Sequence, residues 1–399
     1  MSRISGTELG FSFDILTLGL VMAVAAALRV FPSLWDKTVG PADKSRIHTL
    51  DGARGLLTMW VLAHHLLGGS FVDAKGVWHP PAGALGVLLA SGFFIAPFFM
   101  LTAMLFGGRL LTRPGQIDIL RLVITRTFRL VPVYALAVLI LIVGVFVTTR
   151  FTLQQPAGKI GKEIVRWMLF DFIERYDING VDIQKHYGVL WTLRYEVLFY
   201  AALPLLALVQ RITKGTYIII PALALAGLYS WPFIYFSAGT TAALCTHFSG
   251  KLARRGWQAA AICGIAIICS TASYGISSNW VQAICLIPTF VCLALELPLF
   301  KPIAWRPFRL IGEASYSNYV LHGAVLFILS VMAIDASSIL AQPFWTRMAG
   351  LLVFASASLA LSLASYCFIE RPFIRLGAAL ALRVDTRSTE GVRSPRRLC

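Results

Sequence analysis

The sequence predicts an all-α polytopic membrane protein with about ten to eleven transmembrane helices. Of its 399 residues, 57% are hydrophobic and only 14% are charged, and the mean hydropathy is +0.74. The apolar residues gather in segments long enough to cross a bilayer as helices. The basic residues, which give a net charge of +16, lie mostly in short connections between those segments. This distribution is typical of helical membrane proteins.

Five spans are expected in the first half of the chain. The earliest lacks the basic start and the small-residue cleavage site of a signal peptide, so we interpret it as a span. A connection at 107–129 carries five arginines, and the longest loop, 149–186, contains a possible short surface helix at 164–172. The five predicted spans are 11–30, 54–71, 84–106, 130–148 and 187–209.

Six further spans are expected in the second half. The first two are short and interrupted by proline and glycine, which permits a re-entrant hairpin. The chain then divides into a 1–49 extension with an extra helix, a 50–373 transmembrane domain and a 374–399 basic tail. The six predicted spans are 217–229, 231–248, 257–276, 280–300, 311–334 and 344–369.

The distribution of lysine and arginine predicts the orientation. If the connection after the first span faces inward, 24 of the 35 basic residues lie on the inside and nine on the outside. Because cytoplasmic loops carry the excess of Lys and Arg, we expect a cytoplasmic C-terminus. The net charge therefore indicates membrane topology, not nucleic-acid binding. No Cys or His spacing suggests a metal site or a disulfide framework.

The most unusual stretch begins at Leu50 and ends at His65. Arg54 and His65 are eleven residues apart, so on a helix they share one stripe, roughly 16 Å apart along the axis. Ionisable groups at membrane depth usually face a bundle interior or a water-filled cavity. A snorkelling anchor would explain Arg54, and an interhelical hydrogen bond would explain a histidine. The stripe favours a functional site, with His65 preferred over His64.

Two other predicted spans contain polar and ionisable side chains. On the fifth span, Glu196 and Tyr200 share a face, whereas Arg194 points some 160° away. On the tenth, Tyr319 and His322 share a face. A neutral histidine can move a proton near pH 7, and a buried carboxylate can orient it. These groups suit group transfer to a hydroxyl, and they suit a transporter's proton relay equally well.

The pair Arg126 and Arg129 gives a different signal. Their i,i+3 spacing projects both guanidiniums from one helix face, and paired guanidiniums bind phosphate oxygens well. Many such pairs only anchor a helix at the membrane surface. The spacing therefore leaves phosphate binding and topology as open alternatives.

Six motifs follow one another along the chain. They are Arg54-x10-His65, the segment from Phe98 to Ala103, Arg126-x-x-Arg129 before Pro132, Leu190-Trp191 to Tyr200, Ser315-Tyr316 to His322, and Ile369-Glu370-x-Pro372. In this order they resemble the motifs of the acyltransferase-3 family of integral membrane O-acyltransferases. The chain departs from the family's Phe-Phe-x-Leu-Ser-Gly motif by Thr102 and Ala103 in the last two places, and by the 49 residues that precede the opening motif.

The resemblance implies an O-acetyltransferase that takes an acetyl group from cytoplasmic acetyl-CoA. Arg126 and Arg129 would hold the donor's phosphates. His65 would act as general base or acid, and would either remove the acceptor hydroxyl's proton or relay the acyl group. Arg54, Glu196 and His322 would assist catalysis. We expect the substrate to contact the aromatic residues Tyr200, Tyr316, Tyr319 and Trp191.

The expected acceptor is a hydroxyl of a cell-envelope or exported polysaccharide sugar, and the expected location is a bacterial inner membrane. Loop 149–186 is the expected acceptor contact. One alternative is an acyltransferase acting on a small molecule such as an antibiotic or lipid. Another, of a different class, is a proton-coupled transporter, which would show substrate flux without coenzyme A turnover.

Overall fold

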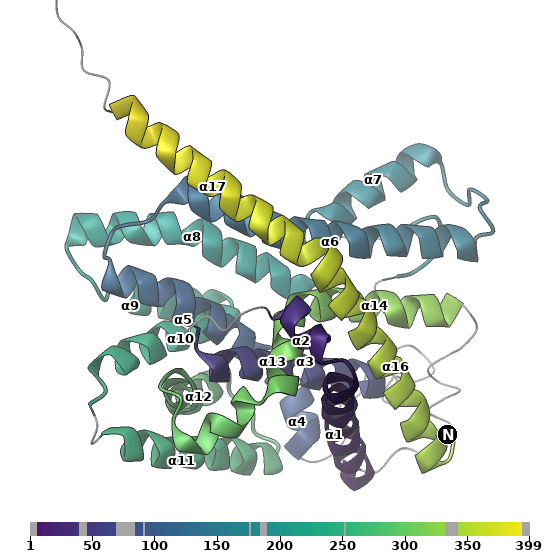
Figure 1. The fold of residues 1–399 in the computed structure, drawn as a ribbon, viewed down its shortest axis with the longest axis horizontal. Helices are drawn as coiled ribbons and strands as arrows, with labels where there is room; N and C mark the ends of the chain where they lie inside the picture. The colour runs from purple at the N-terminus through teal and green to yellow at the C-terminus, as the bar shows by residue number, and fades with distance from the viewer. Residues whose placement is uncertain are drawn as a thin grey trace, which may run out of the picture.

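The computed structural model describes residues 6–39, 46–68, 84–90, 92–174, 177–183, 190–250, 253–331 and 342–392. Over these residues the chain is helical and contains no β-strand, as the sequence predicts. The helices cross at varied angles and form a bundle around one hydrophobic core (Figure 1).

The first part of the chain forms five helices. α1 (Gly6–Val30) corresponds to the first predicted span, and α2 (Pro32–Thr38) follows after Phe31. α3 (His48–Gly68) begins before the predicted start at residue 54, so the whole opening motif lies within the helix. The span predicted at 84–106 is wrong as a single helix. It is divided into α4 (Ala84–Ala90) and α5 (Ala96–Thr112), and Gly92 between them has a φ of +71°.

The middle of the chain contributes α6 (Ile119–Thr148), α7 (Ala157–Met168) and α8 (Trp191–Thr213). α6 begins inside the region predicted as a basic loop, because Asp118 caps it by accepting a hydrogen bond from the Arg121 backbone N–H at 2.9 Å. Arg126 and Arg129 consequently lie well inside a helix, as their i,i+3 spacing predicts. α7 is the predicted surface helix, shifted toward the N-terminus, and the indole of its Trp167 is fully buried.

The next helices form antiparallel neighbours. α9 (Ile219–Tyr229) and α10 (Pro232–Phe248) pack together as a tight pair, and α10 also packs on α5. α11 (Ala253–Ser273) packs against α12 (Asn279–Ala294). The ninth predicted span is bent by 72° where the 3₁₀ helix η3 (Pro298–Ala304) follows α12.

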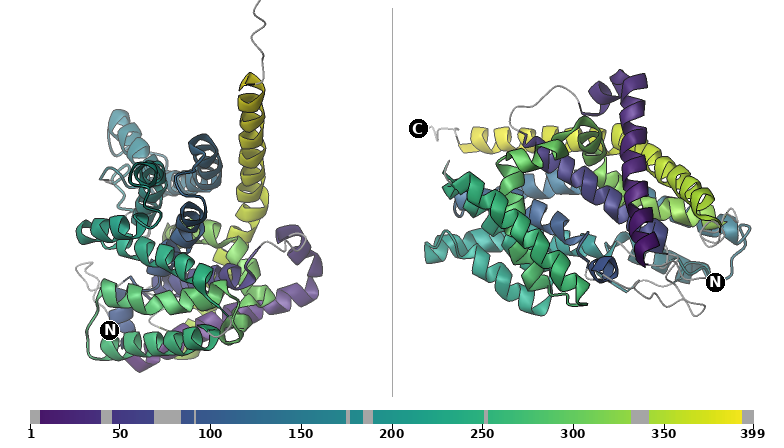
Figure 2. Two further views of the ribbon diagram at one scale, coloured as in Figure 1. Left: turned by 90° about the vertical axis from the view of Figure 1, so that its left-hand side faces the viewer. Right: turned by 90° about the horizontal axis from the view of Figure 1, so that it is seen from below.

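The last predicted spans also differ in detail. The tenth is two helices, α13 (Arg306–Glu313) and α14 (Ser315–Val331). α16 (Phe344–Ser365) passes through a π-helical turn, η4 (Tyr366–Glu370), into α17 (Arg371–Val392). Most of the predicted tail is therefore helical, and α17 packs on α6 before it projects from the bundle (Figures 1 and 2).

Five helices among the described residues are long and apolar enough to cross a membrane, and the bent pair of α12 and η3 would make a sixth. This supports an integral membrane protein. The count of ten to eleven spans and the side of the C-terminus stay predictions. The five candidate spans are Ser12–Val30, Ile119–Thr148, Trp191–Thr213, Arg254–Ser273 and Phe344–Val384.

Glycines bring α3 and α13 into direct backbone contact. A Cβ atom at Gly55 would overlap the carbonyl oxygen of Phe308, and one at Gly312 would overlap the carbonyl oxygen of Asp51. Gly52 meets the carbonyl oxygen of Ile303 in the same way. Small residues at helix contacts in membranes allow such close approach. The contact fixes the position of the helix that carries Arg54 and His65.

A network of charged side chains lies at one end of the contact between α3 and α13. Arg46 forms an ion pair with Asp51 at 2.8 Å and a second one with Glu313 of α13. The hydroxyl of Tyr366, in η4, donates a hydrogen bond to Glu313 at 2.8 Å. The network therefore joins α3, α13 and η4 where the chain enters α3.

Substitution of Gly55 by valine should destabilise the protein, because the added atoms meet rigid backbone and not a movable side chain. We expect a cost of about 1–3 kcal/mol, the usual range for overpacking, measured as a lower melting temperature in detergent. Gly158→Ala on α7 is the matched control, since nothing lies within 4 Å of a Cβ at that position. An unchanged melting temperature for Gly55→Val would show that α3 and α13 do not pack as described.

Candidate functional site

A cavity of about 100 Å³ lies among α3, α5, α6, α8 and α14. Its lining combines charged and hydroxyl groups with an apolar wall from α5 that includes Phe98 and Phe106. The structure thus gathers residues that are 265 positions apart in the sequence. The predicted site residues that line it are Arg54, Arg126, Arg129, Glu196, Tyr200, Tyr316 and Tyr319.

Three guanidiniums face this cavity. In the described part of the chain, neither Arg54 nor Arg129 forms an ion pair with a carboxylate within 4 Å. The Arg126 side chain lies over the rings of Phe106 and Tyr200, with its Cζ 4.9 and 5.5 Å from their centroids. Its buried Nε has no hydrogen-bond partner among the described residues. The cavity is therefore rich in positive charge that the protein does not neutralise by direct contact.

Four carboxylates lie within electrostatic reach of these arginines: Asp51 and Glu313, which act on Arg54, and also Glu196 and Glu370. Glu196 on α8 accepts a hydrogen bond from the Tyr200 hydroxyl at 2.5 Å, one helical turn away. Glu370 in η4 is 1% exposed and accepts from the Ser317 hydroxyl at 2.7 Å. Glu196 and Glu370 interact electrostatically with Arg129, and Glu370 interacts also with Arg54. These carboxylates reduce the repulsion between the arginines through longer-range electrostatic attraction and not through ion pairs.

The two faces of α8 separate as the helical periodicity predicts. Glu196 and Tyr200 line the cavity, and Arg194 does not. The Arg194 guanidinium instead donates to the Tyr195 hydroxyl at 3.1 Å and to the Asp171 carbonyl at 3.4 Å. Arg194 therefore connects α8 to the segment after α7 and takes no part in the cavity.

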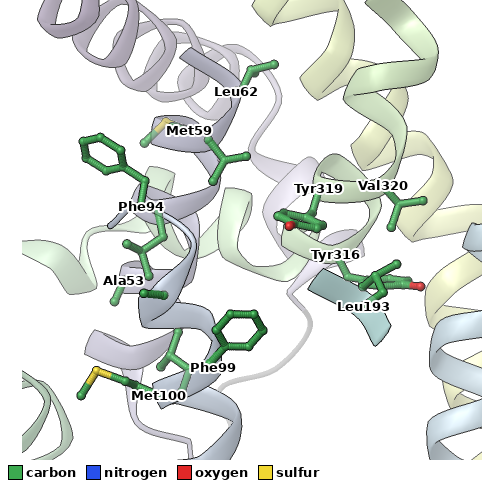
Figure 3. Packing of buried hydrophobic residues seen from close by; sticks show 14 of the residues in the cluster. Ala53, Met59, Leu62, Phe94, Phe99, Met100, Leu193, Tyr316, Tyr319 and Val320 are labelled. Atoms are coloured by element: carbon green, nitrogen blue, oxygen red, sulfur yellow. The ribbon is translucent and has the colours of Figure 1, made fainter. Parts of the chain in front are cut away.

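Two tyrosines of α14 form the wall of the cavity. The Tyr319 and Thr192 hydroxyls are 2.6 Å apart and hydrogen-bonded, which ties α14 to α8. The Tyr316 hydroxyl donates to the Leu130 carbonyl at 2.7 Å, which ties α14 to α6. Figure 3 shows the rings of Tyr316 and Tyr319 together with Leu193 on one side of the packed core.

The histidines form a separate group beside the cavity. The ring centroids of His65 and His322 are 5.1 Å apart, and those of His64 and His65 are 4.8 Å apart. The His65 Nε2 is buried without a hydrogen-bond partner in the described chain. None of the three rings lines the cavity, but the Tyr319 ring, which does, is centred 6.3 Å from that of His322. Tyr319 thus lies between the arginines and the histidines.

Backbone and side-chain contacts hold His322 in place. Its Nδ1 lies 2.9 Å from the Asn318 carbonyl oxygen, so in the tautomer that donates this bond, Nε2 carries the lone pair. The Asn318 Oδ1 accepts from Ser362 at 3.1 Å and from Ser358 at 3.3 Å, both on α16. The pairing of α14 with α16 therefore fixes the orientation of the ring next to His65.

Trp191 is the one predicted site residue that the structure places in neither group. Its ring packs edge-on against Tyr195 at 5.8 Å and Trp231 at 5.6 Å. These contacts give it a packing role where α8 begins. Its neighbour Thr192 lines the cavity instead, although nothing in the sequence pattern favours Thr192 over Trp191.

Phe106 and Glu370 were also missed as parts of the site. Phe106 follows a recognised motif on α5, so helical spacing from Phe98 and Thr102 could have placed it on the same face. Glu370 lies in the closing motif, but nothing in the sequence pairs it with Arg129. Among the described residues, no group of three or more His, Cys, Asp or Glu side chains is arranged to hold a metal ion.

Comparison with known proteins identifies the family of the chain. A family model described as an acyltransferase domain matches residues 47–367, which is most of the chain. No curated protein and no solved structure matches the chain significantly. The matched residues include the helices that build the cavity and the histidine group. Because the match covers most of its length, the chain belongs to the acyltransferase-3 family.

Proposed function

We propose that this membrane acyltransferase moves an acetyl group from acetyl-CoA to a hydroxyl of a cell-envelope or exported polysaccharide. One observation carries the proposal. A cavity lined by three arginines lies beside a group of histidines, and Arg54 and His65 are separated along α3 by about 16 Å. A long donor with phosphates at one end and a thioester at the other suits such a separation.

The arginines supply the binding end of this proposal. Guanidiniums bind phosphate oxygens with paired, charge-assisted hydrogen bonds. Arg126 and Arg129 stand on one face of α6, and Arg54 faces them from α3. A diphosphate in the cavity would neutralise charge that no carboxylate contacts directly. The small volume favours a phosphate group or a short acyl group over a long acyl chain.

The histidines supply the reactive end. In the proposed step, the acceptor hydroxyl oxygen attacks the thioester carbonyl carbon, while the hydroxyl proton passes to His65 Nε2. The new C–O bond forms, the C–S bond breaks, and the proton then passes from His65 to the coenzyme A sulfur, which leaves as a thiol. His322 packs against His65 and orients its ring.

Glu196 has a positioning role in this scheme. Its carboxylate is fixed by the Tyr200 hydroxyl and lies on the same cavity wall as the Tyr319–Thr192 pair. From there it can hold an acceptor hydroxyl or balance the charge of the arginines. The family resemblance supports a sugar acceptor and a bacterial inner membrane. A small-molecule acceptor would use the same residues.

Replacement of His65 by alanine should lower kcat by about 10²–10⁴-fold, the usual contribution of a general base. Affinity for coenzyme A should stay within threefold, because the arginines are intact. The assay is coenzyme A release by the purified protein in detergent, with His247→Asn as control, a histidine on α10 away from the site. Loss of activity in His64→Asn but not in His65→Ala would reassign the base. Substrate flux without any coenzyme A release by the wild type would favour a transporter.

Replacement of Arg129 by glutamine should raise the KM for acetyl-CoA about tenfold or more, with a smaller effect on kcat. A hydrogen bond to a charged group contributes about 1.5–3 kcal/mol, and 1.4 kcal/mol corresponds to tenfold. Arg121→Gln is the matched control, since Arg121 is exposed on the same helix. Equal effects of the two substitutions on KM would argue against a donor site at the cavity.

Replacement of Tyr200 by phenylalanine separates two roles of this residue. The ring that lies under Arg126 is retained, and only the hydroxyl that donates to Glu196 is lost. We expect kcat to fall roughly tenfold, as for one hydrogen bond to a charged group, and the KM for acetyl-CoA to change less than twofold. A raised KM with an unchanged kcat would place Tyr200 in donor binding and not in the positioning of Glu196.

A further inference from the structure

A second cavity, of about 330 Å³, lies on the other side of α3 from the arginines. α3 and α5 line both cavities with neighbouring residues. Ala53 faces the second cavity and Arg54 the first, and Pro97 faces the second and Phe98 the first. Figure 3 shows Ala53 and Phe94, which line the second cavity, apart from Tyr316 and Tyr319, which line the first.

The lining of the second cavity is apolar. Among the described residues, it consists almost entirely of aliphatic and aromatic side chains from α3, α4, α5, α11, α12 and η3, and none of these residues is charged. The Thr289 Oγ1 is buried without a hydrogen-bond partner among the described residues. A water molecule needs two to four polar partners, and apolar cavities of this kind stay dry and accept apolar ligands. The lining therefore selects a hydrocarbon and excludes a sugar or a phosphate.

The position of the cavity indicates where the hydrocarbon comes from. Ile265 and Cys269 of α11 line it and are also exposed, Ile265 to 41%. They lie within Arg254–Ser273, one of the helices apolar and long enough to cross a membrane. On the inner side, Leu286 and Phe290 of α12 are buried. The cavity thus extends from the lipid-facing surface of α11 to the core beside α3.

We propose that this cavity binds one acyl chain of a bilayer lipid, which enters between the exposed residues of α11. The chain fills space next to Ala53 and Leu57 and so supports α3 from the side opposite the arginines. The glycine contact with α13 holds the same stretch of the helix through Gly55, which is not among the residues that line the cavity. The lipid chain is a structural ligand, and its binding does not depend on the identity of the acyl donor or acceptor.

The test uses the full chain in nanodiscs that contain phosphatidylcholine with a diazirine in the middle of one acyl chain. After irradiation, peptide mapping locates the lipid adducts. We expect adducts on the buried residues Leu286 and Phe290 in addition to the outward residues of α11. Adducts confined to outward positions such as Ile262 and Ile267, both exposed, would overturn the proposal.

A matched pair of variants tests the entry path. Cys269→Trp places a large ring at the exposed end of the cavity, and Cys263→Trp places the same ring on an exposed position of α11 outside it. We expect Cys269→Trp to reduce labelling of Leu286 and Phe290 at least fivefold and Cys263→Trp to change it less than twofold. Ile265→Trp replaces Cys269→Trp if the latter does not elute as a monodisperse protein. Equal labelling in all variants would overturn the proposal.

Discussion

Three arginines lie within a largely apolar helical bundle. The free-energy cost of removing their charges from water is the constraint on which the rest of the structure depends. A guanidinium removed from water is strongly destabilising unless hydrogen bonds, charges or a polar cavity compensate. Here the compensation is indirect: Glu196 and Glu370 interact electrostatically with Arg129, and aromatic rings lie against Arg126. A cavity bounded by such groups is suited to an anion that completes the neutralisation. The helices α3, α6 and α8 surround the cavity and supply the charged groups that balance one another in this way.

The rigidity of α3 sets the distance between Arg54 at the cavity and His65 in the histidine group. The helix is held by backbone contact at Gly52 and Gly55, and by the ion pairs of Arg46 where the chain enters it. Because a continuous helix fixes the rise per residue, Arg54 and His65 keep a constant separation. The Tyr319 side chain lies between the arginines and the histidines. A donor that reaches both must therefore be long, with its anionic and reactive parts at opposite ends.

Helical periodicity predicted much of the site. It placed Glu196 and Tyr200 on one face of α8 and excluded Arg194, and the structure confirms this division. It did not predict the interruptions of α4–α5 and α13–α14, because apolar composition continues through each break. The break at Gly92 depends on a backbone angle, and α13 depends on packing against α3. The proximity of Glu370 to Arg129 was also beyond the sequence, since it arises only when α17 packs on α6.

The position of Trp191 also depends on contacts that only the fold provides. A large aromatic residue in a recognised motif suggests contact with substrate, but its neighbours Tyr195 and Trp231 come from packing that only the fold brings together. Thr192, a smaller residue, reaches the cavity because it is one position further around the helix. Distinguishing the two required the direction of each side chain, which depends on where α8 begins.

An experimental structure of the protein with coenzyme A would test the assignment of the site. We predict that the diphosphate lies within hydrogen-bond distance of at least two of Arg54, Arg126 and Arg129. The sulfur should lie on the side of Tyr319 that faces His65 and His322. Coenzyme A bound elsewhere, with the cavity residues in contact with none of its phosphates, would contradict the assignment of the site.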